Sequence, residues 1–258
     1  MLIVKYAKFL PEFVKSHLIQ VGAHFGHEAP TYEDAGFLAV AWIEADPDIF
    51  KELSLNISKC HKSRHTVHNA LITASSDSKH QFYRYSNQGA SNSLYLPTDI
   101  FKQSFEGVNL TENVIELTSL TLNDFIAIND IAPSALVIDV QGAEMEVLKG
   151  ASKALESASI IEIEISTRKV YSGGAEFVQV DKYIKSFGFV RITHVPWHGD
   201  VIYINPQRLP LSSNLGLLLV SMQYACEYYS AKVMRFIVST FTRPKHAFHK
   251  LIYRLTKG

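Results

Sequence analysis

Short apolar runs and amphipathic segments alternate through the middle of the chain. Several runs are apolar at every position, as the central strands of a parallel sheet require, and the segments between them have helical spacing. This alternation predicts an α/β fold: a Rossmann-like, doubly wound and mostly parallel sheet with right-handed crossovers and an antiparallel last strand. The strands are expected at residues 17–21, 38–43, 66–72, 135–140, 159–165, 189–194 and 201–204. The helices are expected at residues 27–35, 47–58, 143–148, 152–157 and 176–187.

Residues 75–130 interrupt this alternation. They include HQFYRYSNQGASNSLYLP, where aromatic and polar residues alternate around a turn at residues 89–93, and then NVIELTSL. A period of two with a glycine turn predicts β structure. We therefore expect one Rossmann-like domain over residues 16–205 with a β insertion at about 75–120. The insertion should lie over the carboxyl edge of the sheet, where such folds bind ligands.

Both ends of the chain have the spacing of amphipathic helices. Residues 1–15 predict one such helix, and residues 206–258 predict a helical extension whose last helix follows Pro244. The apolar positions at i, i+3, i+4 and i+7 are Tyr6, Phe9, Leu10 and Phe13 at the start, and Phe248, Leu251, Ile252 and Leu255 at the end. Such a helix packs on its own domain or on a second copy of the chain, and a basic one also lies on anionic membranes. Both alternatives stay open for the C-terminal extension.

The charge distribution sets this extension apart from the rest of the chain. The formal net charge of the 258 residues is +0, which argues against a dedicated nucleic-acid binder. The hydrophobic fraction of 47% is enough for a sizeable core. Residues 205–258 contain eight lysines and arginines and one acid, Glu227, a net charge of +7, so residues 1–204 carry −7. A peripheral membrane contact through the basic extension is therefore one expectation.

The cysteines and the longest apolar run bear on the compartment. Cys60 and Cys226 form neither a disulfide framework nor a paired-cysteine metal motif, which favours a reducing environment. The start, MLIVKYAKFL, is interrupted by two lysines and has no cleavage site of a secretory signal. The longest apolar run, at residues 215–226, is shorter than the roughly 20 residues that span a bilayer. We expect a cytoplasmic protein.

The stretch LIQVGAHFGHEAP, residues 18–30, has the features of a ligand-binding turn. An apolar strand ends at Gly22, and Gly26 follows four positions later, so a ligand can approach the backbone and the next helix N-terminus. This is not the G-x-G-x-x-G pattern of dinucleotide sites. Glu44 ends the second strand 22 residues after Gly22, where it can accept hydrogen bonds from both ribose hydroxyls. An adenosyl cofactor without a pyrophosphate therefore fits better than NAD or a nucleotide sugar.

A third segment, IDVQGAEMEVLKGA at residues 138–151, ends an apolar strand in Asp139 and opens a helix at Glu144. This strand is expected beside the first one, which brings Asp139 close to the glycine turn. A carboxylate after ALVI is costly to bury without a purpose or a partner. Glu144, in contrast, is favourable at a helix N-terminus without any function.

The segment PWHGD places Trp197, His198 and Asp200 just before the last strand. An aromatic face beside polar groups suits a saccharide, although His-Gly-Asp is also ordinary turn chemistry. A histidine group at positions 61, 65 and 68 follows Cys60. These side chains should lie on a loop and need not converge, so no metal is expected.

Several motifs, in this order, resemble the FkbM-type methyltransferases between Ser16 and Asn205. They are LIQVGAHFG, IEADP, HNALI, SNSL, TL at 121–122, IDVQGAEMEVLKGA, IEIE, GFVRIT and WHGDVIYIN. The resemblance implies a Rossmann-like fold, S-adenosylmethionine as methyl donor, and O-methylation of a sugar, a glycolipid or a secondary metabolite. The residues that it implies for donor binding are Val21, Gly22, Ala23, His24, Gly26, Glu44, Ala45, Asn69, Ala70 and Asp139.

The chain departs from the family at three positions. Gln20 stands where the family usually has Asp, Gln141 where it usually has Glu, and Val137 where it often has Lys. Positions 137, 139 and 141 of a continuous strand share one side, and Gln20 should lie on the neighbouring strand. Removing carboxylates weakens the electrostatic support for a sulfonium cation, although glutamine keeps hydrogen-bonding capacity.

Methyl transfer to an alcohol needs an in-line geometry and gains from a base within hydrogen-bond reach. Asp139 or His198 is the expected base, with Glu144 and His194 as further candidates, and Glu144, Trp197 and Asp200 are expected to contact the acceptor. The expected partner is a hydroxyl-bearing small molecule or glycan. The lost carboxylates motivate an alternative, a degenerate donor-binding module that assembles with glycan-modifying enzymes.

Overall fold

The computed structural model describes residues 1–242, and only part of the side chains from residue 224 onward. The chain forms two compact units, residues 1–217 and 218–258, and each is treated by itself. A seven-stranded sheet in the order β3-β2-β1-β7-β8-β10-β9 forms the centre of the first unit. Its strands are β1 (Leu18–Val21), β2 (Ala39–Glu44), β3 (Arg64–Asn69), β7 (Ala135–Ile138), β8 (Ile160–Ser166), β9 (Val190–Arg191) and β10 (His198–Ile204).

The strand directions confirm the predicted fold class. Strands β3, β2, β1, β7 and β8 are parallel neighbours, whereas β10 is antiparallel to both β8 and β9. The order reverses at β1, so the carboxyl ends of β1 and β7 lie side by side at the point where ligands bind in such sheets.

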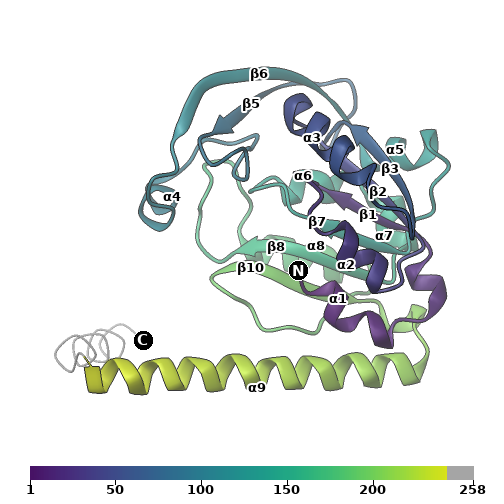
Figure 1. The fold of residues 1–258 in the computed structure, drawn as a ribbon, viewed down its shortest axis with the longest axis vertical. Coiled ribbons are helices and arrows are strands. Elements are labelled where there is room, and N and C mark those ends of the chain that lie inside the picture. The colour runs from purple at the N-terminus through teal and green to yellow at the C-terminus, as the bar shows by residue number, and fades with distance from the viewer. Residues whose placement is uncertain (243–258) are drawn as a thin grey trace. The chain divides into compact units, whose positions relative to one another are not determined.

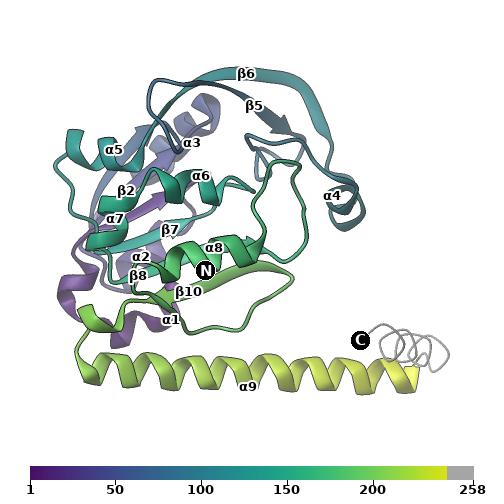
Figure 2. The same cartoon turned by 180° about the vertical axis from the view of Figure 1, so that it is seen from behind.

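Helices cover both faces of the sheet. Helices α1 (Ile3–Tyr6), α2 (Ala29–Asp34) and α3 (Pro47–Ile57) lie on one face, towards the viewer in Figure 1. Helices α5 (Leu122–Ile128), α6 (Glu144–Lys149), α7 (Ser152–Ser157) and α8 (Phe177–Lys185) lie on the other, as Figure 2 shows. The sequence pattern did not predict α5, whose first turn is capped by the Thr121 side chain accepting from the Asp124 N–H. Phe125 and Ile126 of α5 join the main apolar core.

One face of β8 and β10 is polar, which corrects the expectation of strands apolar on both faces. Ile161, Ile163 and Ile165 belong to the apolar core, so the alternating residues Glu162 and Glu164 point to the opposite face. The register places Glu162 between Val137 of β7 and Ile202 of β10, and Glu164 opposite Asp200. A row of carboxylates therefore crosses the sheet on the side of α1 and α2.

The N-terminal segment covers part of this polar face. Glu162 is 2% exposed and accepts hydrogen bonds from the backbone N–H groups of Leu2, at 2.8 Å, and Ile3, at 2.6 Å. The segment is not the continuous amphipathic helix expected for residues 1–15. The four-residue α1 is followed by the 3₁₀ turns η1 (Ala7–Phe9) and η2 (Glu12–Lys15), because Pro11 between them cannot continue a helix. Phe13 is accordingly 52% exposed.

The segment after β3 leaves the main sheet and forms a second one, in the order β4-β6-β5. Its elements are β4 (Leu71–Ile72), β5 (Lys79–Tyr85), α4 (Asp99–Ser104) and β6 (Leu110–Leu120). We call residues 73–120 the excursion; β5 and β6 form its long arch in Figure 1. The strand expected at residues 66–72 is split, because its first part pairs with β2 and its last two residues pair with β6.

The short turn η3 (Pro206–Arg208) leads into α9 (Leu211–Thr242). Leu217 is buried, and the apolar residues on the other side of the helix are exposed. We call these residues the α9 stripe: Leu211, Leu215, Leu218, Met222 and Tyr229. The amphipathic helix expected at residues 248–255 lies outside the described residues. Within the described part of the chain, no helix is both long and apolar enough to cross a bilayer.

Candidate active site

The turn after β1 brings the ends of two strands into direct contact. Gly22 has φ +81°, and a Cβ atom there would lie 1.8 Å from the carbonyl oxygen of Asp139, at the end of β7. Gly22 and Ala23 both donate their backbone N–H to the carbonyl oxygen of Ile43, at 3.0 Å each. Gly26, with φ +66°, lets Leu53 of α3 approach, since a Cβ would be 2.6 Å from Leu53 Cδ1. The two glycines therefore serve packing, which in turn shapes the loop.

Glu44 lies at the end of β2 with its carboxylate turned towards this loop. It is 6% exposed; Oε2 accepts from the His24 N–H and Oε1 from the Asp46 N–H, both at 2.8 Å. Each oxygen keeps a second lone pair, so the group can still accept two hydrogen bonds from a diol. Burial raises the pKa of Glu44 to about 7, against the backbone N–H groups of Asp46, His24 and Ala45, which favour the ionised form.

A cleft of about 640 Å³, measured out to its open mouth, lies beside these groups; we call it the first pocket. Of the donor residues expected from the sequence, the pocket is lined by Val21, Gly22, His24, Glu44, Ala45, Ala70 and Asp139. The other three, Ala23, Gly26 and Asn69, are not among its lining residues. Asn69 Nδ2 donates to the carbonyl oxygens of Glu44 and Ala45, at 2.8 and 3.0 Å, and so holds the turn that carries Glu44.

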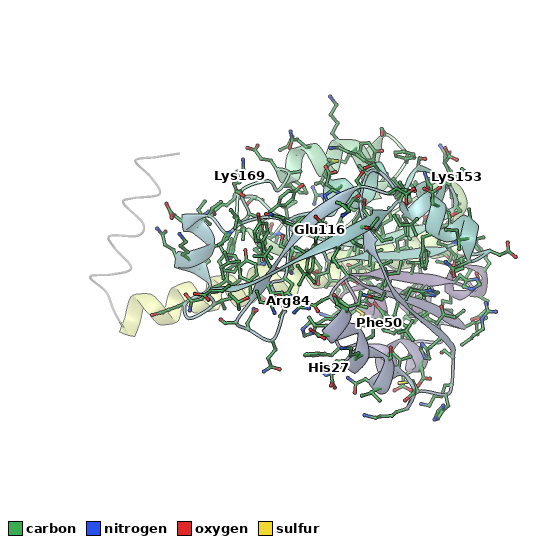
Figure 3. All side chains as sticks on the ribbon, turned by 90° about the horizontal axis from the view of Figure 1, so that it is seen from above. His27, Phe50, Arg84, Glu116, Lys153 and Lys169 are labelled. Atoms are coloured by element: carbon green, nitrogen blue, oxygen red, sulfur yellow. The ribbon has the colours of Figure 1, made fainter. Side chains whose placement is uncertain are left out.

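The excursion supplies much of the remaining lining, which the sequence pattern did not identify. The additional lining residues are Ile43, Leu71, Ile72, Phe82, Gly89, Ala90, Asn92, Leu94, Val140, Gln141 and Ala143. Polar contacts bind the excursion to the end of β2. Asp46, which caps α3, accepts from Asn92 Nδ2 at 2.9 Å and pairs with Arg84 Nη2 at 2.6 Å. Arg84, labelled in Figure 3, belongs to β5, and Asp46 caps the start of α3, so this ion pair fixes the cover over the pocket.

The turn after β7 forms one wall of the first pocket. Gln141 has φ 52° and lies outside the strand, which ends at Ile138, so it does not continue the side shared by positions 137 and 139. Gln141 Nε2 donates to Asp139 Oδ1 at 2.7 Å and to Glu164 Oε2 at 2.8 Å. Gln141 Oε1 accepts from the Tyr171 hydroxyl at 2.9 Å. Gly142 follows with φ +100°, and a Cβ there would lie 2.7 Å from the Tyr171 ring.

Gln20 lies on the neighbouring strand β1, as expected, but its contacts differ from those of Gln141. It is buried beside Val137 in the sheet, and its Oε1 accepts from the Tyr32 hydroxyl at 2.8 Å. It lines another cavity, which it shares with Glu28, Asp139, Glu162 and Asp200. Asp200 therefore faces this cavity and lines neither the first pocket nor the second pocket described below.

A second pocket, of about 330 Å³, lies on the far side of the Gln141–Gly142 turn. Glu144, Glu164, Tyr171 and His198 are among its lining residues. His198 Nδ1 is 2.6 Å from Ser166 Oγ, and His198 Nε2 is 3.4 Å from Glu164 Oε1. Glu144 Oε1 accepts from the Gly142 N–H at 2.9 Å, so Glu144 also holds the dividing turn. The sequence analysis missed Glu164, Ser166 and Tyr171, although the alternation of IEIEIS already places Glu164 and Ser166 on one side.

An aromatic group stands beside this pocket. The ring of His198 is 5.3 Å from that of Phe105 and 5.4 Å from that of Trp197, and the Phe105 and Trp197 rings are 6.5 Å apart. Trp197 is 46% exposed, so part of its face is open to a ligand. Phe105 comes from the excursion, directly after α4, and could not be associated with His198 from the sequence.

Burial raises the pKa values of the carboxyl groups around the dividing turn. Burial raises the pKa of Asp139 to about 6 and that of Glu144 to about 7, and it raises the pKa of Glu164 well above its ordinary range. Neighbouring carboxylates reinforce the effect on Glu164, with Asp139 the first of them. Burial lowers the pKa of His198, which leaves its imidazole neutral near pH 7.

The other histidines singled out in the sequence have separate surroundings. His65 Nδ1 accepts from Trp42 Nε1 at 3.1 Å, and His65 Nε2 lies 3.3 Å from Glu33 Oε1. The His68 ring packs edge-on against Phe125, with ring centroids 4.9 Å apart. Among the described residues, no group of three histidine, cysteine or acidic side chains is arranged to hold a metal ion.

Comparisons with known proteins identify the family. The model of the methyltransferase FkbM domain matches residues 20–191, which is more than half of the chain. No curated protein matches the sequence.

Solved structures with a similar chain course include proteins from bacteria and archaea, all at low identity. A protein in the NADB-Rossmann superfamily from Streptococcus agalactiae is 10% identical, with 95% of this chain and 88% of that chain covered and a TM-score of 0.44. Fibrillarin from Methanococcus jannaschii, a pre-rRNA processing protein, is 14% identical over 76% and 68% of the two chains, with a TM-score of 0.44. Fibrillarin from Aeropyrum pernix, crystallised with natively bound S-adenosyl-L-methionine, is 13% identical over 79% and 74%, with a TM-score of 0.39. The family match covers the strands and turns that build the first pocket, and the chain belongs to the FkbM-domain methyltransferases, which use S-adenosylmethionine as methyl donor.

Proposed function

We propose that this methyltransferase transfers the methyl group to a hydroxyl of a saccharide, a glycolipid or a secondary metabolite that enters the second pocket. The observation that supports this most is the pairing of His198 with Glu164 directly across the Gln141–Gly142 turn from the first pocket. A neutral imidazole next to a carboxyl group is suited to take a proton from an alcohol, which is a poor nucleophile until it is deprotonated.

The first pocket fits the donor. Both carboxylate oxygens of Glu44 can accept a further hydrogen bond, one from each ribose hydroxyl. Gly22 has no side chain, and a Cβ atom at this position would clash with Asp139. Phe82, Ile72 and Leu94 supply the apolar surface that an adenine ring requires. When bound, S-adenosylmethionine supplies a methyl group activated by its sulfonium. The chain's own task is to hold the acceptor oxygen in line with that methyl and to remove the hydroxyl proton.

We assign the proton to His198 Nε2. Nδ1 is occupied by Ser166 Oγ at 2.6 Å, which fixes the ring orientation, and Glu164 lies 3.4 Å from Nε2. The imidazolium that results would be stabilised by the negative charge that Glu164 and Asp139 carry between them. Asp139, the other base expected from the sequence, has its Oδ1 occupied by Gln141 at the dividing wall. This favours a role for Asp139 as a negative charge beside the positive groups of the reaction, and not as the base.

The aromatic group favours a saccharide over a flexible aliphatic alcohol. Trp197 and Phe105 present ring faces beside the proposed base, and ring faces pack well against the C–H surface of a sugar. A test is the release of S-adenosylhomocysteine with a panel of mono- and disaccharides. His198→Ala should lower turnover by roughly 10²–10⁴-fold and leave donor affinity unchanged. The exposed His61→Ala is the matched control.

Three results would count against the proposal. Normal turnover of the His198 variant excludes this base. Methylation of amines but not of hydroxyls excludes the acceptor class. Donor binding without turnover on any of the panel favours the donor-binding module over the enzyme.

We further propose that the acceptor is presented at an anionic membrane surface. The α9 stripe is an exposed apolar side of one helix, and the basic residues of the extension follow it along the chain. Apolar and cationic groups together are what a peripheral helix uses to bind anionic lipid.

A further inference from the structure

The side chain of Gln141 is bonded at both ends of its amide. Its nitrogen donates to Asp139 and Glu164, at 2.7 and 2.8 Å, and its oxygen accepts from Tyr171. Ser93 Oγ also donates to the backbone oxygen of Gln141 at 2.7 Å. A flipped amide would turn its oxygen towards two carboxyl groups, so the observed orientation is the favourable one. A single –NH₂ group thus joins two carboxyl groups that come from different strands.

Few positive charges contact these two carboxyl groups directly. Among the described side chains, no lysine or arginine pairs with Asp139 or Glu164, and His198 lies 3.4 Å from Glu164. Arg168 and Lys169 line the second pocket with Glu164, and the Met1 ammonium, 3.9 Å from Asp200, lines a cavity that Asp139 also lines. The other titratable groups that face the pair are acids or a phenol: Glu28 ahead of α2, Glu144 on α6, Asp200 on β10 and Tyr171 in the loop after β8. If Asp139 and Glu164 were both ionised, a single amide would have to stabilise two negative charges, which raises the free energy of that state.

We propose that Gln141 is a positioning residue that holds Asp139 and Glu164 as a pair sharing one proton. Asp139 then carries the single negative charge towards the first pocket, and Glu164 presents a neutral carboxyl group to the second. The directions of the pKa shifts agree, since burial raises both pKa values, the neighbouring Asp139 adds to the rise at Glu164, and the hydrogen bond from Gln141 opposes the rise at Asp139. Glutamine suits this position because it donates to both partners, which a carboxylate cannot do.

The arrangement has a consequence for the donor that does not depend on the acceptor. S-adenosylmethionine carries a sulfonium cation, whereas S-adenosylhomocysteine is neutral at the same atom and shares the adenosyl contacts. The ratio of their affinities therefore measures the negative charge at the dividing wall. One opposite charge at about 4 Å is worth about fivefold in a water-like dielectric, and more in a drier site.

Calorimetric titration of the full chain with each compound, from pH 5 to pH 8.5, tests the proposal. The wild-type preference for S-adenosylmethionine should fall about fivefold as the pH is lowered through about 6, where Asp139 takes up its proton. Asp139→Asn should lack the preference at every pH. Glu164→Gln should keep it at pH 8, because the glutamine replaces a carboxyl group that is already neutral.

Gln141→Ala should move the midpoint to higher pH, because Asp139 loses the hydrogen bond that favours its ionised form. Glu144→Gln serves as control for the group that titrates near pH 7, and S-adenosylhomocysteine affinity shows that each variant is folded. The proposal is overturned if Glu164→Gln abolishes the preference as Asp139→Asn does, since Glu164 would then be ionised. It is equally overturned if Gln141→Ala keeps the wild-type midpoint. Failure to bind either compound would instead contradict the donor assignment of the first pocket.

Discussion

Glu162 allows a quantitative test of how the polar face of the sheet affects stability. Its carboxyl group is buried under the N-terminal segment and is bonded to two backbone N–H groups. Burial, reinforced by the nearby Asp200, raises the pKa of Glu162 from 4.5 to about 8 in the folded protein. Between these two values the folded state binds a proton that the unfolded state has released. The contribution of this group is therefore greatest below pH 4.5 and is lost as the pH rises through about 8.

The size of the effect follows from the shift. At about 1.36 kcal/mol per pKa unit, the stability attributable to this group falls by about 5 kcal/mol between pH 4.5 and pH 8. Glu162→Gln cannot ionise, so its unfolding free energy should lack this slope. The substitution also turns an amide N–H towards one backbone donor, which costs about 1–3 kcal/mol at every pH. The variant should therefore be the less stable protein at pH 5 and should gain on the wild type as the pH rises.

Urea denaturation of both proteins at unit steps from pH 5 to pH 9 measures the difference in slope. The buried carboxyl groups that do not interact with Glu162 titrate in both proteins and cancel in the comparison. Glu112→Gln, at an exposed position of β6, should track the wild type throughout. If the Glu162→Gln curve runs parallel to the wild-type curve, Glu162 keeps an ordinary pKa and the reasoning is refuted.

Three further predictions concern the glycine turn, the ribose contact and the extension. Gly22→Ala should abolish donor binding, because its Cβ would lie 1.8 Å from the Asp139 carbonyl oxygen. Gly107→Ala, at nearly the same φ but with nothing within 4 Å, should cost only about 1–2 kcal/mol of stability in denaturation and bind the donor normally. Glu44→Gln should weaken S-adenosylmethionine and S-adenosylhomocysteine alike, by about 1.5–3 kcal/mol in calorimetry, and a selective loss of one compound would contradict its assignment to ribose. Replacing three residues of the α9 stripe by glutamine should reduce the fraction of the protein that sediments with anionic vesicles, whereas Ser212→Ala should not. Equal sedimentation of the two variants would contradict the membrane proposal.

The parallel core of the fold could be predicted from the sequence because its strands are apolar runs bounded by clear turns. Local capping signals also placed α3, where Asp46 accepts from the Asp48 N–H and Pro47 occupies the first turn. The N-terminal helix was wrong because periodicity does not report the break that Pro11 imposes. Helix α5 was missed because its segment followed a β insertion and was assigned to it.

The first pocket could be predicted in part, and the second hardly at all. Gly22, Glu44 and Asp139 end consecutive elements of the sheet, so their convergence follows from topology. Glu164 meets Gln141 only because β8 lies beside β7 and the turn after β7 has a positive φ. Neither the side of β8 on which the core packs nor the docking of the excursion can be derived from local pattern.

The excursion contributes to both ends of the proposed reaction. It lines the first pocket through residues 89–94, it brings Phe105 to His198, and Tyr85 and Phe101 pack against Tyr171, which holds Gln141. The range of acceptors and the affinity for the donor should therefore change together when the excursion changes. A chimera that exchanges residues 73–120 for those of a relative would change what is methylated, and it would alter the dwell time of the spent donor in the same step.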